Sequence, residues 1–382
     1  MKRLWKSIPP CCSDVLGFMA VINQLDGIGI IDDPSKYKPA KKKGKKSSRV
    51  LHSNIRNEDV IRGTEKKVLA AFEKAKEKSP AFVMLSSAPS SAMIGSDPDT
   101  YAALISGQGI PACAVKIDGE KDYLYGIGVT LEALGKLLLK PAVKIPRSVN
   151  LIGLNPVDFL KEETDELIAA VEETERTVLS VWGIQETSEN LKKAASAELN
   201  LVVNISGLRL ARYMEAEFGI PYIAGSLIGE VNRKAVFTAL ESSAEASGEL
   251  HYLFPEAIPK CTRRTEKVVI AGEQFTGNAL RTMLLERGFL NVSVISFYDM
   301  DKTFMLQGDK KIIGEDDLTL MCKDADLILA DPDFRTAANT KAKWIPLPNP
   351  ASLSPVAAPE NFNKFGAHAD AWLNTELRKA GF

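Results

Sequence analysis

Cysteine is scarce in this chain, which has five among its 382 residues. Cys11 and Cys12 stand side by side in "PPCCSDVLGF", and the others are Cys113, Cys261 and Cys322. A disulfide framework built from so few thiols would be sparse, and a disulfide between neighbouring cysteines is strained. The cysteine content therefore argues against a disulfide-rich secreted protein.

The scattered cysteines and the adjacent pair have different interpretations. Cys113 and Cys322 lie in the apolar stretches "GIPACAVKI" and "LTLMCKDADLI", so we expect both to be inert core thiols. From the residues alone, Cys11 and Cys12 are either inert thiols or soft ligands of an iron–sulfur cluster. Because such a cluster requires four ligands, the second interpretation needs ligands from elsewhere, such as another chain across an interface.

Net charge is also nearly absent. The formal charge is −1 at pH 7, which gives no global attraction for nucleic acid or an acidic membrane. No apolar run reaches the roughly 18–20 residues of a membrane span. The basic N-terminus "MKRLWKSIPPCC" lacks the apolar stretch of a signal peptide. We therefore expect a cytoplasmic protein that binds neither nucleic acid nor a membrane.

Histidine and the common hydrolase motifs are missing too. The three histidines, His52, His251 and His368, fall in no H-E-x-x-H motif and form no pair at helical spacing, so we expect surface or packing roles. The sequence contains no G-x-S-x-G nucleophile turn. It also contains no G-x-x-x-x-G-K-[ST] loop, so the chain does not itself resemble a P-loop ATPase.

A dinucleotide-binding fingerprint is present only in part. Gly272 and Gly277 stand at a strand-to-helix turn in "VVIAGEQFTGNAL", without the full G-x-G-x-x-G. Asp299 lies farther along the chain than the usual ribose-binding acid. These glycines are interpreted as permitting a tight turn, with a dinucleotide site as the alternative.

What the sequence does contain is a regular alternation of strands and helices. Short apolar runs such as 81–88, 148–154 and 267–271 predict buried strands, and amphipathic stretches such as 57–79 and 130–140 predict helices. Such alternation predicts parallel sheets covered on both faces. We predict an α/β fold with three Rossmann-like lobes, comprising residues 1–147, 148–265 and 266–382.

A basic segment interrupts the first lobe. "DDPSKYKPAKKKGKKSSR" combines proline, glycine and serine with like charges: Lys36, Lys38, Lys41, Lys42, Lys43, Lys45, Lys46 and Arg49. We interpret this lysine-rich segment as a solvated surface loop, with a docking patch for an acidic partner or substrate as the alternative.

Several stretches resemble component 1 of the nitrogenase superfamily, and they occur in family order through nearly the whole chain. The first five are "PPCCSDVLGF", "LHSNIRNEDVIRGTEKKVLAAFEKA", "FVMLSSAPSSAMIGSDPDTY", "SVNLIGLNPVDF" and "AELNLVVNISGLRLARYMEAEFGIPYIAG". The sixth is the pair "EKVVIAGE" and "DADLILADP". The resemblance implies three Rossmann-like lobes and an assembly of paired, related subunits. It also implies an iron–sulfur cluster at the subunit interface, fed by an ATP-dependent iron–sulfur reductase.

The chain departs from this family at the cluster cysteines. Cluster-bearing members have three, and the first corresponds to Cys12 or, less well, to Cys11. The second should fall near Lys36 and Tyr37, and the third at Pro89, where no thiol is present. The cysteine that holds the metal cofactor of true nitrogenase should fall at Val203 or Asn204. The resemblance therefore implies no iron–molybdenum-type cofactor bound in that way.

Reduced ligand sets do occur in this superfamily. In dark-operative protochlorophyllide reductase, one subunit supplies three cysteines and its partner a single aspartate. By that resemblance, this chain would contribute Cys12, with Asp32 or Asp33 as alternatives, to a cluster completed by a paralogous cysteine-rich subunit. The lysine-rich segment would then lie near a subunit or reductase interface.

The leading hypothesis is a subunit of a nitrogenase-like oxidoreductase complex that performs a low-potential reduction of a small molecule. In it, an iron–sulfur cluster is shared with the partner subunit in a hetero-oligomer. Two alternatives remain open at this point: a scaffold on which a metal cofactor is assembled, and a metal-free structural member of the family.

Overall fold

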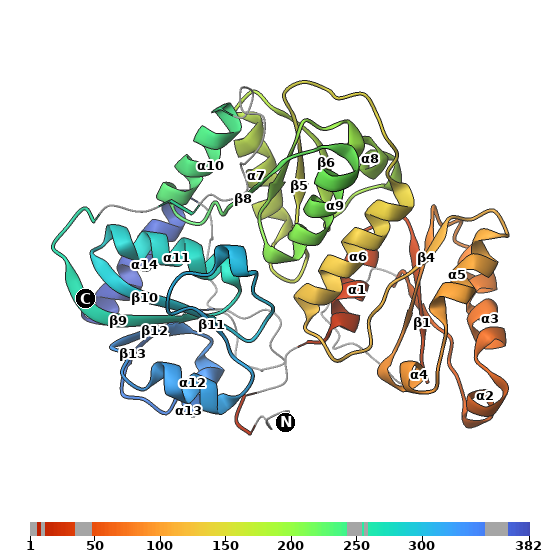
Figure 1. The fold of residues 1–382 in the computed structure, drawn as a ribbon, viewed down its shortest axis with the longest axis horizontal. Coiled ribbons are helices and arrows are strands. Elements are labelled where there is room, and N and C mark those ends of the chain that lie inside the picture. The colour runs from red at the N-terminus through yellow and green to blue at the C-terminus, as the bar shows by residue number, and fades with distance from the viewer. Residues whose placement is uncertain (1–5, 9–11, 35–47, 243–253, 256–258, 348–365) are drawn as a thin grey trace.

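The computed structural model describes residues 6–8, 12–34, 48–242, 254–255, 259–347 and 366–382. Cys11, His251 and most of the lysine-rich segment lie outside these residues. Within them, three parallel β-sheets alternate with helices, and this confirms the predicted α/β fold (Figure 1).

The first lobe is built on a four-stranded sheet of order β2-β1-β3-β4. Its central strand, β1, is buried along its whole length, as expected for the apolar run "IGII" in a sheet covered on both faces. The strands are β1 (Ile28–Asp32), β2 (Val50–His52), β3 (Val83–Ser87) and β4 (Ala112–Ala114). The helices are α1 (Asp14–Ile22), α2 (Asn57–Arg62), α3 (Glu65–Lys76), α4 (Pro89–Met93), α5 (Pro98–Ser106) and α6 (Tyr123–Leu138).

Two helix predictions in this lobe need correction. The helix predicted over 57–79 is divided at Gly63, whose φ of +87° ends α2 before α3 begins. The helix predicted over 130–140 begins earlier, at Tyr123, because the Asp122 carboxylate accepts a hydrogen bond from the Tyr125 amide and caps it. Burial against α1 outweighs the poor helix propensity of the glycines in its first turns.

The second lobe has a four-stranded sheet of order β6-β5-β7-β8. Gly219 ends α9 with a left-handed φ of +62°, as is typical of a glycine cap. The strands are β5 (Ser148–Ile152), β6 (Thr177–Trp182), β7 (Leu199–Val202) and β8 (Tyr222–Ala224). The helices are α7 (Lys161–Glu172), α8 (Ser188–Lys192), η1 (Lys193–Ser196), η2 (Ile205–Gly207), α9 (Leu208–Phe218) and α10 (Glu230–Ser242).

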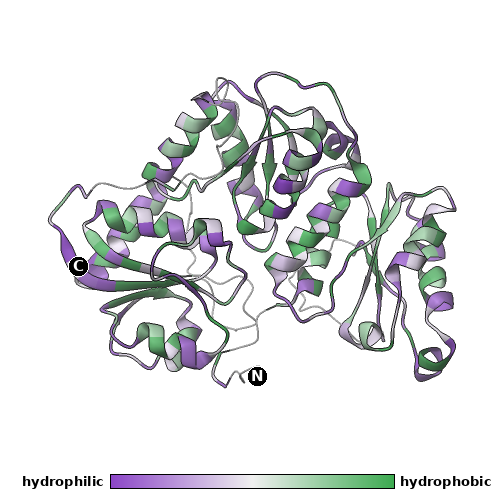
Figure 2. Ribbon diagram, viewed as in Figure 1, coloured by the Kyte–Doolittle hydropathy of each residue, from purple (hydrophilic) through white to green (hydrophobic). Residues whose placement is uncertain are grey.

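The third lobe has a five-stranded sheet of order β11-β10-β9-β12-β13. Its strands are β9 (Arg264–Ala271), β10 (Phe289–Ser296), β11 (Lys310–Lys311), β12 (Leu327–Ala330) and β13 (Lys343–Pro346). Its helices are α11 (Gln274–Glu286), η3 (Lys302–Phe304), α12 (Glu315–Cys322), η4 (Pro332–Phe334), α13 (Arg335–Ala338) and α14 (Gly366–Lys379). Figure 2 shows apolar residues concentrated in the strands and on the inner sides of the helices.

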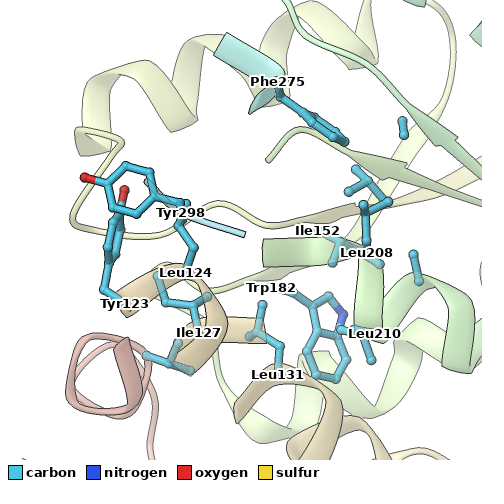
Figure 3. Close-up of a cluster of buried hydrophobic side chains, with 14 of the residues drawn as sticks. Tyr123, Leu124, Ile127, Leu131, Ile152, Trp182, Leu208, Leu210, Phe275 and Tyr298 are labelled. Carbon is cyan, nitrogen blue, oxygen red and sulfur yellow. The ribbon is translucent and has the colours of Figure 1, made fainter. Parts of the chain in front are cut away.

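One hydrophobic cluster passes through all three lobes. It joins Phe18 of α1, Trp182 of β6 and Phe275 of α11, all of them fully buried or nearly so. Figure 3 shows how α6 contributes: Leu131 lies beside Trp182, and Tyr123 lies beside Tyr298. The lobes therefore share a core, and α6 lies at its centre.

Helices α1 and α6 approach so closely that their backbones touch. A Cβ added at Gly126 would lie 2.1 Å from the carbonyl oxygen of Asp14, and one at Gly17 would lie 2.2 Å from that of Tyr123. Only glycine fits at such distances. The two glycines thus allow the start of α1 to pack directly against the start of α6.

Candidate functional site

The topology of each sheet marks one place where a ligand is expected. The chain reverses its direction of winding between β1 and β3, between β5 and β7, and between β9 and β12. In open parallel sheets, ligands bind in the crevice beyond the carboxyl ends of the strands at such a switch point. The residues that follow these strands are therefore the candidates for a ligand-binding site.

The switch points of the second and third lobes meet. Glu273, which follows β9, accepts a hydrogen bond from the backbone amide of Ile205, which follows β7, at 3.3 Å. Asp158, beyond β5, accepts hydrogen bonds from the side-chain amides of Asn155 at 2.9 Å and Asn204 at 3.4 Å. Residues far apart in the sequence thus form one polar site between two lobes.

The first lobe contributes a tyrosine to the same place. Tyr123, the first residue of α6, donates its phenolic O–H to Asp158 Oδ1 at 2.7 Å. Its ring meets the edge of Tyr298, beyond β10, with the centroids 5.4 Å apart (Figure 3). We call Tyr123, Asn155, Asp158, Asn204 and Glu273 the junction cluster.

Burial controls the acid–base character of the junction cluster. Burial raises the pKa of Glu273, the negative charge of Asp158 raises it further, and hydrogen bonds from the Phe275 and Thr276 amides oppose the rise. Burial likewise raises the pKa of Tyr123 well above its usual value, with Asp158 adding to the effect. These groups therefore favour their protonated forms and can hold protons in a site away from bulk water.

The junction cluster contains the position at which the family resemblance implies a cofactor cysteine. Val203 packs in the apolar core of the second lobe. The Asn204 side chain accepts hydrogen bonds from the amide and hydroxyl of Ser206, at 3.0 and 2.8 Å, while it donates to Asp158. The site is built from oxygen and amide groups, which suit proton transfer better than soft-metal binding.

The switch point of the first lobe is arranged differently. Asp32, at the end of β1, is 2% exposed, and its carboxylate accepts three hydroxyl hydrogen bonds. Ser53 donates at 2.6 Å, Thr64 at 2.7 Å and Ser96 at 2.6 Å. Because both oxygens are occupied by donors of the same lobe, Asp32 holds this edge of the sheet together and is a poor candidate for a cluster ligand.

Asp33, the next residue, is equally buried and pairs with a histidine. Its Oδ2 lies 2.7 Å from Nδ1 of His52, which is 23% exposed at the side chain. His52 thus has a specific carboxylate partner, which the sequence pattern did not predict. His368 is exposed on α14.

Cys12 and Pro89, the position at which the resemblance implies a third cluster cysteine, both lie against the stretch 118–123. The carbonyl of Cys12 accepts a hydrogen bond from the Tyr123 amide at 3.1 Å, and the Asp14 carboxylate accepts one from the Gly119 amide at 2.8 Å. A Cβ at Gly119 would lie 2.4 Å from Pro89, so Pro89 packs on the same loop. The loop 118–123 therefore joins the Cys12 segment to Pro89.

The fit of a cluster to this place can be judged from the donors. Cys12 is partly buried against the core and supplies one thiol, while Pro89 supplies no ligand atom. In the part of the chain that the structure describes, no group of three or more His, Cys, Asp or Glu side chains could hold a metal ion. These residues do not fit a complete cluster without ligands from another chain.

The other thiols are arranged as expected for structural residues. Cys322 is fully buried, and burial raises its pKa to about 12. Cys113 is half-buried against the core, and burial, together with the charge of Asp99, raises its pKa to about 12. Neither thiol is activated as a nucleophile. Cys261 is exposed.

The dinucleotide alternative is not supported at Gly272 and Gly277. A phosphate would have to sit at the N-terminus of α11, but the Glu273 carboxylate already accepts hydrogen bonds from the Phe275 and Thr276 amides, at 2.9 and 2.8 Å. Gly277 instead allows close packing, because a Cβ there would lie 2.6 Å from Val294.

A comparison with family models identifies the family of this chain. The model of the nitrogenase component 1 type oxidoreductases matches residues 36–336, which is well over half of the chain. This chain belongs to the nitrogenase component 1 family of oxidoreductases. The matched range includes the junction cluster, whereas Cys12 lies outside it.

Solved structures agree with the family assignment. The structure described as "Nitrogenase Cp1 at pH 6.5" aligns with a TM-score of 0.73 and 13% identity, covering 100% of this chain and 94% of that chain. "Nitrogenase Cp1 at pH 5" aligns with a TM-score of 0.65 and 15% identity, covering 100% and 89%. At such identities the similarity establishes the fold. No curated protein sequence matches the chain.

Among the described residues, every helix is too short or too polar to cross a bilayer.

Sequence reasoning missed Tyr123, Asp158 and Glu273, although Asp158 and Glu273 each follow a buried strand closely. A search for polar residues just beyond predicted strands could have found these two acids.

Proposed function

We propose that this chain is a non-autonomous subunit of a nitrogenase-like oxidoreductase complex that reduces a small molecule at low potential. It pairs with a paralogous cysteine-rich component 1 subunit in the cytoplasm. Cys12 contributes one ligand to an iron–sulfur cluster held mainly by that partner. An ATP-dependent iron–sulfur reductase delivers the electrons.

The observation that carries this proposal is the position of Cys12. Within a chain of the nitrogenase component 1 family, Cys12 and Pro89 contact one loop, and of these two residues Cys12 carries a thiol. A single thiolate is too few for a cluster but is a sufficient share of one. The bound cluster would supply electrons one at a time.

The junction cluster supplies the second requirement of a reduction, which is protons. Glu273 and Tyr123 favour their protonated forms because they are buried, and the Tyr123 hydroxyl is bonded to Asp158. Tyr123 also bonds the Cys12 carbonyl through its amide. In this proposal the chain stores protons at the junction and positions them beside the electron entry. Dinitrogen is not the proposed substrate, because Val203 and Asn204 replace the cofactor thiol.

The test is to purify the complex without oxygen from cells that produce this chain, and to measure which chains are present and how much iron and acid-labile sulfide they contain. We expect a second, cysteine-rich subunit and a cluster whose occupancy falls in Cys12→Ala. Cys113→Ala serves as the matched control, since it removes a thiol of similar burial, and should keep the iron.

Three results would contradict the proposal. They are unchanged iron in Cys12→Ala, a complete cluster in each isolated monomer, and a stable metal-free homodimer as the sole product. Iron that is present transiently, without turnover, would instead indicate an assembly scaffold.

A further inference from the structure

A cavity of about 670 Å³ lies beside the junction cluster, between α6, α9 and the loop that follows β10. Its volume is within the range of small-molecule sites. Leu124, Leu208 and Met300 give it apolar walls, and Tyr125 and Tyr213 add aromatic rings. Ile205 and Ser206 separate it from Glu273 and Asn204.

Most charges around this cavity are already paired. Arg212 of α9 holds Asp301 at 2.6 Å, and Lys136 of α6 holds Glu132 at 2.6 Å. Asp299 is paired with Lys311. These acids and bases neutralise each other, so they contribute little net charge to the cavity.

Arg209 is held less tightly. Its Nη1 forms a long ion pair with Glu132 Oε2, at 3.9 Å, and shares that carboxylate with Lys136, so one positive charge is left in excess. The guanidinium forms no hydrogen bond with any residue that the structure describes. The guanidinium stacks on the Tyr125 ring, 4.9 Å from the centroid, and its side chain is 47% exposed. The stacking fixes the plane of the guanidinium and leaves its N–H donors free for a ligand.

From this arrangement we infer that the cavity binds an organic monocarboxylate with an apolar body, and that Arg209 holds the carboxylate. One uncompensated positive charge is matched by one negative charge. A dianionic phosphate would leave excess negative charge near Glu132, Asp299 and Asp301. The apolar and aromatic walls accommodate the body of the ligand, as in other small-molecule sites.

This inference goes beyond the proposed function, because it requires neither a cluster nor a partner subunit. The probe is 2-naphthoate, and its neutral isostere 2-naphthamide is the matched ligand control. Binding to the full chain is measured by calorimetry near neutral pH, so that failure here does not affect the iron measurement.

We expect 2-naphthoate to bind and 2-naphthamide to bind at least about tenfold more weakly, since the amide cannot form the charged hydrogen bonds. Arg209→Met should weaken 2-naphthoate binding by about tenfold to a hundredfold. Arg209→Lys keeps the positive charge but lacks the planar guanidinium. Its affinity for 2-naphthoate should lie between those of the unmodified chain and Arg209→Met. Arg335→Met is the control variant, because Arg335 also stacks on an aromatic ring, Trp344, outside the cavity. It should bind like the unmodified chain.

Several results would overturn the inference. Equal affinity for the acid and the amide would show that charge is not recognised. Unchanged binding in Arg209→Met, with native-like circular dichroism, would exclude Arg209 as the anchor. Tighter binding of inorganic phosphate than of 2-naphthoate would overturn the monocarboxylate assignment.

Discussion

The carboxyl edge of the first sheet and the junction cluster both place buried carboxylates at or beyond the ends of parallel strands. The first connects residues of one lobe, and the second connects residues of different lobes. Asp32 accepts its three hydroxyl hydrogen bonds from residues of its own lobe. Asp158 accepts from Tyr123 of the first lobe, and Glu273 from Ile205 of the second. The same feature of topology thus makes an internal brace in one region and a seam between lobes in the other.

This difference indicates which of the two regions can take part in proton transfer. Asp32 is enclosed by hydroxyl donors, so its lone pairs are occupied and the site has little capacity for a reaction. At the seam, donors come from separate lobes, and burial leaves Glu273 and Tyr123 inclined to hold protons.

Asp32→Asn should have the largest effect on stability. The NH2 group that replaces one carboxylate oxygen donates hydrogen bonds and cannot accept them, so at least one of the Ser53, Thr64 and Ser96 hydroxyls loses its acceptor in a buried site. We expect a loss of about 3 kcal/mol in the free energy of unfolding, measured by urea denaturation. Hydrogen exchange should increase in the first lobe alone.

The control for Asp32→Asn is Asp324→Asn, an exposed aspartate of the third lobe that should change stability little. Faster exchange in all lobes of Asp32→Asn would show that the brace is not local, and the contrast would fail.

Asp158→Asn should cost less but act more widely. Its Oδ2 accepts from two side-chain amides and its Oδ1 accepts from the Tyr123 hydroxyl, so the new NH2 group must face donors on one side, at a cost of about 2 kcal/mol. Hydrogen exchange should increase both at the start of α6 and beyond β5 and β7. An increase confined to one lobe would show that Asp158 does not join them.

Cys322→Ala and Cys12→Ala form a pair that separates packing from function. Cys322 is fully buried in the third lobe, and its truncation should cost about 1 kcal/mol without changing iron content. Cys12 is only partly buried, so its truncation should cost less than that while lowering cluster occupancy. Equal loss of iron in both variants would mean that the loss follows from instability.

Glu273→Gln should change the pH dependence of stability. Because burial raises the pKa of Glu273 above its ordinary value of 4.5, protonation favours the folded state. That contribution is present below 4.5 and is lost as pH rises through the raised pKa. The unmodified chain should therefore gain stability relative to Glu273→Gln as pH falls from neutral, as measured by urea denaturation at several pH values. The opposite slope would show that the amide hydrogen bonds outweigh burial.

Much of the fold could be predicted from the sequence because buried parallel strands are apolar runs. β3, β5 and β9 were recognised in this way. β13 was missed, since "KWIP" is short, is only partly buried and contains a proline at its end. The division of the helix at Gly63 was missed because periodicity alone does not detect a backbone turn.

The junction cluster could not be predicted from local patterns. Tyr123, Asp158 and Glu273 are separated by long stretches of chain, and their contacts exist only after three lobes have closed on one core. Tyr123 in particular is the first residue of α6, whereas the sequence predicted this helix only from residue 130. By contrast, the resemblance directed attention to Cys12 and Pro89, which the structure does bring to one loop.

The backbone contact of α1 and α6 at Gly17 and Gly126 has a consequence for how this molecule can move. Because the Cys12 segment is locked to the helix that begins at Tyr123, neither can shift without the other. A movement of the third lobe would leave the contact between α1 and α6 unchanged. The backbone distance between Cys12 and Tyr123 should therefore stay nearly constant when other parts of the molecule move.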